Sequence, residues 1–237
     1  MTLTLSLLAA IAIVWALVAI AVHYRLGLGK AQALLYAPFK LVFRIDDRAM
    51  RVARKADAPV IYAVVHQSRI EPALMLSLLP ADTLHILDEA SAASSWLEPW
   101  RELARTIAFN AEHIFVSRRL VRVLRGKGRL AVYIPDDEAP DVKALRLYRA
   151  IAHIAMQAEA RIVPIFVDGS RLLPGAFKPA AGDRRSLFPK LSINVLEPMS
   201  MDEMTAASPD PAARKRDILF DRVALARPAP RGNGAAS

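Results

Sequence analysis

The fold is decided by the stretch Val60-Ile61-Tyr62-Ala63-Val64-Val65-His66-Gln67-Ser68-Arg69-Ile70-Glu71-Pro72. Residues 60–65 predict a short buried strand, because they are apolar throughout and rich in β-branched side chains. Pro72 is typical of a turn or of the first position of a helix, which places Glu71 at the start of the next helix. His66 is therefore expected at the end of the strand, where it and Glu71 can meet over a cleft.

His66 and Glu71 are residue types that can together activate a hydroxyl group. An imidazole can take a proton from a hydroxyl nucleophile, and a nearby carboxylate can fix the tautomer of the imidazole. The spacing by itself is also compatible with a structural histidine that is held in a hydrogen bond at a strand end. The catalytic pair is the hypothesis, and the structural histidine is the alternative.

The rest of the chain alternates short apolar runs with helical patterns, which indicates an α/β fold. The other expected strands are Thr83–Leu87, Ile114–Phe115, Leu130–Ile134, Ile162–Val167 and Leu191–Val195. The expected helices are Pro72–Leu79, Ser95–Thr106, Ser117–Arg125 and Val142–Glu159. We expect one globular domain over residues 51–207, followed at 208–237 by a helix remnant and a disordered tail rich in Pro, Ala and Arg.

The N-terminus contains a candidate membrane anchor over residues 1–24. Residues 3–22 carry no charge, and a helix of that length can cross the roughly 30 Å hydrocarbon layer of a bilayer. Basic residues follow the run instead of preceding it, which differs from a signal peptide and favours a cytoplasmic location for the domain. We therefore expect a single-pass protein of a bacterial-type inner (cytoplasmic) membrane. The alternative is a buried helix of a soluble core.

The next segment, residues 25–50, is expected to lie close to the membrane. It is mostly apolar, and Lys40 and Arg44 are spaced four residues apart. This pattern fits an amphipathic helix that lies along the bilayer with its basic groups at the lipid head groups. It fits equally well an ordinary helix that packs on the domain.

Composition limits the classes of function and partner. The chain has no cysteine, which excludes disulfides, thiolate nucleophiles and zinc–thiolate sites. His85, His113 and His153 lack the spacing of metal ligands and are interpreted as structural. The formal net charge of +9 indicates an anionic partner. Because the chain has an apolar anchor and no nucleic-acid-binding motif, we expect an anionic membrane and no nucleic acid.

Four landmarks occur in an order that resembles the PlsC-type glycerophospholipid acyltransferases, over residues 58–198. The first is His66-x4-Glu71, which corresponds to the His-x4-Asp motif that follows a strand in that family. The others are Ile134-Pro135-Asp136-Asp137-Glu138 at the place of Phe-Pro-Glu-Gly, Ile162-Val163-Pro164-Ile165 with Asp168-Gly169 at the place of a Val-Ile-Pro-Val strand, and Phe188-Pro189-Lys190-Leu191-Ser192-Ile193. The likeness is closest to the acyltransferase domain of the bacterial 2-acylglycerophosphoethanolamine acyltransferase.

This resemblance implies a mixed sheet flanked by helices, here preceded by one transmembrane helix. It also implies transfer of a fatty acyl chain from acyl-ACP or acyl-CoA to a lysophospholipid-like membrane acceptor, without a metal ion or an organic cofactor. In that reaction His66 would deprotonate the acceptor hydroxyl, while Glu71 would orient the imidazole and compensate its charge. The substrate-binding residues that the resemblance suggests are Arg69, Arg118, Arg119, Asp136, Arg146, Pro164 and Gly169.

The third landmark departs from the family pattern. Asp137 and Glu138 stand where the family has a glycine and a basic or hydroxyl residue, and three consecutive carboxylates repel a phosphate. The second motif is also poorly kept, at Asn110-Ala111-Glu112-His113. We interpret residues 136–138 as a solvated loop rather than a Mg²⁺ site. A second hypothesis stays open, a catalytically degenerate subunit with a structural or lipid-organising role among other membrane proteins.

Overall fold

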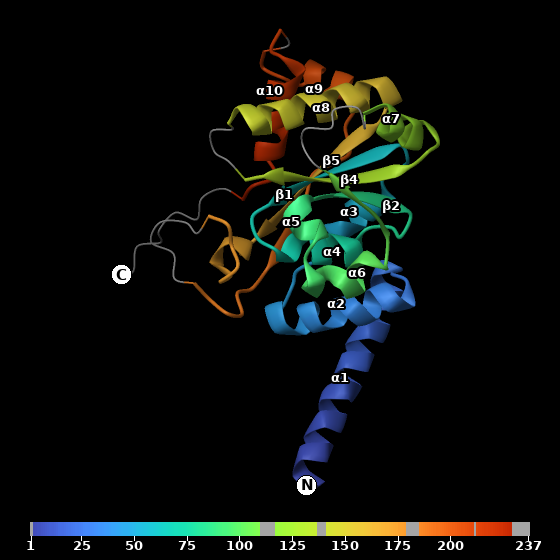
Figure 1. Cartoon of the computed structure of the whole chain (residues 1–237), viewed down its shortest axis with the longest axis vertical. Coiled ribbons are helices and arrows are strands. Elements are labelled where there is room, and N and C mark those ends of the chain that lie inside the picture. The colour runs from blue at the N-terminus through green and yellow to red at the C-terminus, as the bar shows by residue number, and fades with distance from the viewer. Residues whose placement is uncertain (1, 110–116, 137–140, 179–184, 211, 229–237) are drawn as a thin grey trace.

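The computed structural model describes residues 2–109, 117–136, 141–178, 185–210 and 212–228 (Figure 1). Within these residues a six-stranded sheet carries helices on both faces, and one long helix projects away from this body. This is the mixed α/β fold that the sequence predicted.

The sheet places the end of the opening strand at its centre. Its strands are β1 (Val60–His66), β2 (Thr83–Asp88), β3 (Arg105–Phe109), β4 (Arg129–Pro135), β5 (Arg161–Asp168) and β6 (Ser192–Val195). Their order is β3-β2-β4-β1-β5-β6, in which β6 is antiparallel to β5 and the other neighbours are parallel. The sequence of β1 is apolar from Val60 to Val65 because the strand is buried on both faces. The carboxyl ends of the parallel strands, including His66, therefore meet at one edge of the sheet.

Two layers of helices cover the sheet (Figure 1). The first layer contains α2 (Lys30–Phe43), α3 (Met50–Lys55), α4 (Ile70–Leu78) and α6 (Glu98–Arg101). The second layer contains α7 (Ser117–Arg125), α8 (Val142–Ala158), α9 (Met201–Ala206) and α10 (Lys215–Ala224). Side chains alternate along a strand, so Tyr62 and Val64 of β1 enter the first core while Ile61 and Val65 enter the second.

The strands expected to begin near residues 60, 83, 130, 162 and 191 are confirmed, but the continuous helix Ser95–Thr106 is wrong. The chain instead forms a 3₁₀ turn, Ser95–Leu97, and the single turn α6, and it enters β3 at Arg105. The β-branched residues Thr106 and Ile107 of β3 suit a strand, and β3 pairs in parallel with β2. Tertiary pairing thus overrides the local helical pattern. The expected strand Ile114–Phe115 lies outside the described residues.

Helix α1 (Thr2–Leu26) is the projecting helix of Figure 1. By length and composition, its residues Thr4–Leu26 are apolar enough to cross a membrane, with a mean hydropathy of 2.8 and 6% of the most apolar window buried. Many of its apolar side chains between Leu5 and Ile20 are exposed. A bilayer would cover them.

Helix α2 packs on the globular domain, as the second of its two interpretations predicted. Gln32 is buried and donates hydrogen bonds to the carbonyl oxygens of Leu76 and Leu79 at the end of α4. The other side of α2 still exposes apolar side chains, namely Leu34, Leu41 and Val42. The helix is therefore packed on one side and apolar on the other, which also keeps a bilayer contact open to it.

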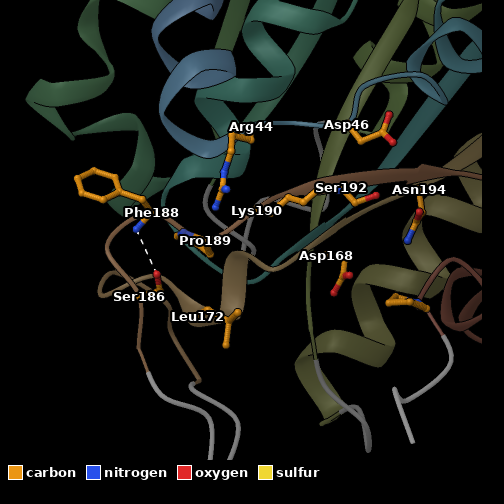
Figure 2. Close-up of a pocket in the computed structure, with 11 residues that line it drawn as sticks. Arg44, Asp46, Asp168, Leu172, Ser186, Phe188, Pro189, Lys190, Ser192 and Asn194 are labelled. Carbon is orange, nitrogen blue, oxygen red and sulfur yellow. Dashed lines mark hydrogen bonds between the residues drawn. The ribbon is translucent and has the colours of Figure 1, made fainter. Parts of the chain in front are cut away.

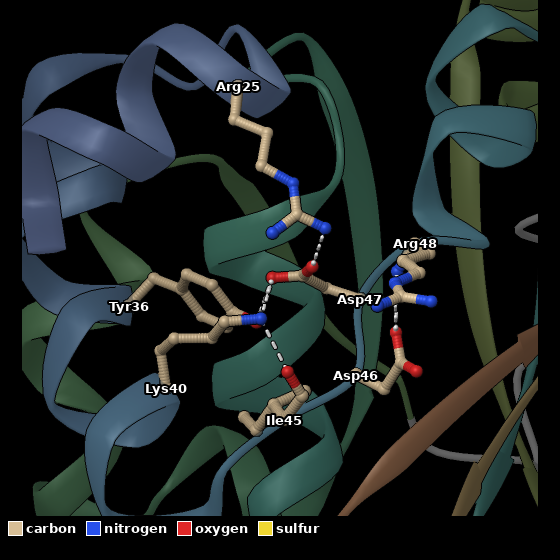
Figure 3. Close-up of polar contacts among 7 residues, drawn as sticks. All are labelled: Arg25, Tyr36, Lys40, Ile45, Asp46, Asp47 and Arg48. Carbon is tan, nitrogen blue, oxygen red and sulfur yellow. Dashed lines mark hydrogen bonds and ion pairs between the residues drawn. The ribbon is translucent and has the colours of Figure 1, made fainter.

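A buried carboxylate joins α1 to the domain (Figure 3). Asp47 is 1% exposed and accepts hydrogen bonds of 2.8 Å from the Tyr36 hydroxyl and from the Lys40 ammonium group. Arg25, near the end of α1, lies 3.4 Å from the same carboxylate. Breaking one partner of such a buried network leaves an uncompensated charge, which is strongly destabilising. The network therefore fixes the end of α1 to the globular domain.

The segment beyond residue 208 contributes to the second layer. Helix α10 buries Ile218, Leu219 and Val223 in the core that it shares with α8. After α10 the chain reaches the carboxyl edge of the sheet, where Arg227 contacts Asp136. This part of the expected helix remnant and tail thus supplies contacts to the core and to the edge that carries His66.

Candidate active site

His66 lies at the carboxyl edge of the sheet, which is where open α/β sheets bind their ligands. The imidazole is half-buried between two aromatic rings. The ring of Tyr133 from β4 lies 5.6 Å from it, centroid to centroid, and the ring of Phe177 lies 4.9 Å from it at an interplanar angle of 89°. Both rings therefore restrict the orientation of the imidazole, and Phe177 is exposed and covers its outer side.

Glu71 lies in the first turn of α4 and is fully buried. Its Oε2 accepts hydrogen bonds of 2.9 Å from the backbone N–H and from the hydroxyl of Ser68. Burial raises the pKa of Glu71 to about 7, although the hydrogen bonds from Ser68 act in the opposite direction. The side chain is thus positioned rigidly beneath the loop that follows His66. The expected contact between its carboxylate and the imidazole stays a prediction.

Gln67 anchors the same loop on its other side. Its Nε2 donates a hydrogen bond of 2.6 Å to Asp136, and its Oε1 accepts one of 2.7 Å from the Ser170 hydroxyl. Its backbone carbonyl accepts a hydrogen bond of 2.9 Å from the N–H of Phe177. Three separate segments of the chain therefore hold the residue that follows His66.

Asp136 is buried, so the interpretation of a solvated acidic loop is wrong for this residue. Arg171 donates to its Oδ2, at 2.8 Å from Nε and also through Nη2, and Nη2 of Arg227 lies 2.7 Å from its Oδ1. Burial would raise the pKa of Asp136, but Gln67, Arg171 and Arg227 together hold it below its usual value. Two guanidinium groups on one carboxylate leave a net positive charge. The charge of Asp136, which was expected to repel a phosphate, is therefore compensated, while Asp137 and Glu138 lie outside the described residues.

All four of the suggested substrate-binding arginines are exposed. Arg69 lies in the loop between His66 and Glu71 and precedes the first residue of α4. Arg118 and Arg119 lie in the first turn of α7, and Arg146 lies in the second turn of α8. Arg69 is thus the one that shares a loop with the candidate pair, whereas the other three belong to the second helical layer.

The structure does not bring Pro164 to the edge of the sheet. Pro164 is buried in the middle of β5, where it pairs with Ala63 of β1. Gly169 does lie at the edge, with φ of +88°, and a Cβ there would be 2.5 Å from the carbonyl oxygen of Lys190. Glycine is therefore required at position 169 for the close approach of two backbone segments.

A cavity of about 530 Å³ lies beside this edge, next to β5 and β6 (Figure 2). It is lined by Arg44, Asp46, Asp168, Leu172, Ser186, Phe188, Pro189, Lys190, Ser192, Asn194 and Pro228. His66 and Glu71 are not among these residues, so this cavity and the candidate pair occupy different places at the edge. Among the described residues, no group of three or more His, Cys, Asp or Glu side chains is placed to hold a metal ion.

Several residues of the site were missed by the sequence analysis. Gln67, Ser68 and Ser170 are uncharged polar residues, and their closeness in the sequence to His66 and Gly169 was the available signal. Arg227 gave no signal, because it falls in a Pro-, Ala- and Arg-rich stretch that is typical of a disordered tail. Phe177 likewise lies in a loop without any pattern.

No protein-family model matches the chain. Its structure is similar to the crystal structure of the 1-acyl-sn-glycerophosphate acyltransferase PlsC from Thermotoga maritima, with a TM-score of 0.50 and 17% sequence identity. The likeness covers 97% of this chain and 96% of that one. At this identity it shows the fold, and the expected PlsC-like fold is confirmed. The closer likeness to the 2-acylglycerophosphoethanolamine acyltransferase stays a prediction.

Proposed function

We propose that this protein is a membrane-anchored O-acyltransferase. It moves a fatty acyl chain from acyl-ACP or acyl-CoA to a lysophospholipid-like acceptor. The observation that carries the proposal is the placement of His66 at the carboxyl edge of a PlsC-like fold, directly before a loop fixed by Gln67 on one side and by Ser68 and Glu71 on the other. Such a loop holds a base in one geometry, as proton transfer in a transition state requires.

In the proposed reaction, His66 accepts the proton of the acceptor hydroxyl while the hydroxyl oxygen attacks the thioester carbonyl. The tetrahedral intermediate then collapses, the carbon–sulfur bond breaks and an ester bond remains. The departing sulfur takes the proton from the imidazolium, which returns His66 to its neutral form. The attack is direct, so no acyl-enzyme forms.

Glu71 has the role of an electrostatic partner in this scheme. An ionised carboxylate near the imidazole stabilises the imidazolium that forms during proton transfer. Because Glu71 is buried, its charge interacts more strongly with the imidazolium than it would in water.

Arg69 is proposed to hold the phosphate of the acceptor. It is exposed, it lies in the loop between His66 and Glu71, and a guanidinium matches the geometry of a phosphate. Helix α1 and the exposed apolar side of α2 would keep the loop at the surface of a bilayer, from which the acceptor lipid is drawn. We place the domain on the cytoplasmic side of a bacterial-type inner membrane.

The second hypothesis, a catalytically degenerate subunit, depended on the acidic run at residues 136–138. The ion pairs of Asp136 remove that argument for the first residue of the run. We therefore propose the enzyme.

The proposal is tested with the full chain in nanodiscs, a labelled acyl-ACP or acyl-CoA and a panel of lysophospholipids. We expect transfer by the wild type and a loss of roughly 100-fold or more in His66→Ala, as for removal of a general base. His153→Ala is the matched control, because His153 is exposed on α8 and should leave turnover unchanged. Turnover by His66→Ala at the rate of the wild type would overturn the proposal.

A further inference from the structure

We propose that Arg227, supplied by the C-terminal segment after α10, is a positioning residue for His66. It acts through Asp136 and Gln67, so the C-terminal segment is part of the candidate active site. The inference rests on the proposed function of His66.

The two residues at the end of β1 reach opposite sides of the sheet. The imidazole of His66 contacts Tyr133 and Phe177, and Tyr133 belongs to the core beneath the first helical layer. The side chain of Gln67 instead contacts Asp136, where the chain arrives after α10 of the second layer. The strand end is therefore held from the face opposite to the imidazole.

Asp136 connects Gln67 to Arg227 through its two carboxylate oxygens. Oδ2 accepts the hydrogen bond of 2.6 Å from Gln67 and the bonds from Arg171, while Oδ1 lies 2.7 Å from Arg227. Hydrogen bonds hold Oδ2 and the ion pair with Arg227 holds Oδ1, so the carboxylate favours one orientation and so does the amide of Gln67. Gln67 in turn fixes Phe177 through its backbone carbonyl, and the ring of Phe177 lies on the imidazole of His66. The contacts from Arg227 to His66 are thus continuous.

Arg171 alone would already balance the charge of Asp136. It follows Ser170 directly and belongs to the segment that leaves β5, so it reaches Asp136 from the sheet itself. Arg227 adds a second cation on the other oxygen, and its side chain is only 22% exposed. Its contribution is therefore orientation of the carboxylate rather than neutralisation, which is what a positioning residue provides.

Two truncations distinguish the effect of losing Arg227 from the effect of losing the residues that follow it. A stop after Pro228 removes residues 229–237 and keeps Arg227, whereas a stop after Ala226 removes it. We expect the first to turn over like the wild type, and the second and Arg227→Gln to lose roughly 10- to 100-fold in kcat, the scale of a displaced catalytic group. The KM for the acceptor should stay within about twofold, and Arg227→Lys, which keeps the charge, should recover part of kcat.

A second readout does not need turnover. The chain has five histidines, so selective imidazole labelling gives a simple NMR spectrum in which His66→Asn identifies the signal of His66. We expect Arg227→Gln to shift the His66 signal and its titration midpoint, and the stop after Pro228 to leave both unchanged. An unshifted His66 signal together with an unchanged kcat in Arg227→Gln would overturn the inference. If Arg227→Gln shifts the His66 signal but the wild type transfers no acyl group, the positioning role is supported and the proposed function is refuted.

Discussion

Glu71 accepts two hydrogen bonds of 2.9 Å from one residue, Ser68, through its backbone N–H and its hydroxyl. The two residues close the loop that leads from His66 into α4, and Glu71 is fully buried beneath that loop. Its pKa is raised to about 7 by burial, so its charge changes near neutral pH. Both the reaction and the stability of the fold should respond to this titration.

Activity should rise with pH as Glu71 ionises. The carboxylate stabilises the imidazolium only when it is charged, so kcat/KM should increase through about pH 7. Glu71→Gln keeps the shape but not the charge, and we expect it to lose at least about 100-fold in kcat and to shift the inflection. The check is a profile of kcat/KM from pH 5.5 to 9 for both proteins. Superimposable profiles would contradict the role of the charge.

Stability should change with pH in the opposite direction. Because the pKa of Glu71 is raised in the folded protein, its contribution is complete below about 4.5 and is lost as the pH rises through about 7. The shift corresponds to about 3 kcal/mol in the free energy of unfolding. Glu71→Gln lacks this titration and should gain stability relative to the wild type between pH 5 and pH 8. Denaturant unfolding at the two pH values measures the difference, and an equal difference at both would refute it.

His85 and Tyr133 form a buried pair whose partners should be coupled. Nδ1 of His85 lies 3.0 Å from the Tyr133 hydroxyl, and both side chains are buried. His85→Phe should cost about 1–3 kcal/mol at pH 7.5, because it leaves a buried hydroxyl without its partner. Tyr133→Phe should lower the free energy of unfolding by less in the His85→Phe protein than it does in the wild type. Strictly additive losses in unfolding experiments would show that the pair is not coupled.

The same histidine should make the fold sensitive to acid. Burial lowers the pKa of His85 to about 3, so the folded protein holds the neutral form. Its contribution to stability is present above about 6.5 and is lost as the pH falls towards 3. The double variant His85→Phe/Tyr133→Phe should therefore lose less stability than the wild type between pH 6.5 and pH 4. Equal losses in thermal unfolding would contradict this.

Gly169→Ala should destabilise the fold. Position 169 has φ of +88°, and the added Cβ would be 2.5 Å from the backbone oxygen of Lys190. We expect a loss of about 2 kcal/mol or more in the free energy of unfolding. Gly175→Ala is the matched control, since a Cβ there meets nothing within 4 Å. Equal effects of the two substitutions would show that the close approach at Gly169 is not rigid.

Arg69→Ala should weaken binding of the acceptor. Loss of a charge-assisted hydrogen bond to a phosphate is worth about 1.5–3 kcal/mol, which raises KM for the acceptor by roughly 10- to 100-fold with little change in kcat. Arg149→Ala is a suitable control, because Arg149 is also exposed but lies on α8. An unchanged KM for Arg69→Ala would show that residues other than Arg69 bind the phosphate.

The pattern of residues 60–66 was sufficient to place the catalytic candidate. A buried parallel strand needs a continuous apolar run, and the first polar residue after such a run lies at the edge of the sheet. The same reasoning failed at residues 105–109, where strand pairing with β2 decided the structure. It also failed at Asp136, which looks like part of an acidic loop when its partners are unknown.

By itself, the sequence determined the α/β pattern, the apolar N-terminal helix and the position of His66 at a strand end, because each depends on periodicity over a few neighbouring residues. Only the tertiary structure decided how Asp136 is compensated. Arg171 and Arg227 are distant from Asp136 along the chain, and they meet it because β5 and the segment after α10 converge on the same sheet edge. Contacts between such distant segments leave no local pattern, so they become visible only in the folded chain.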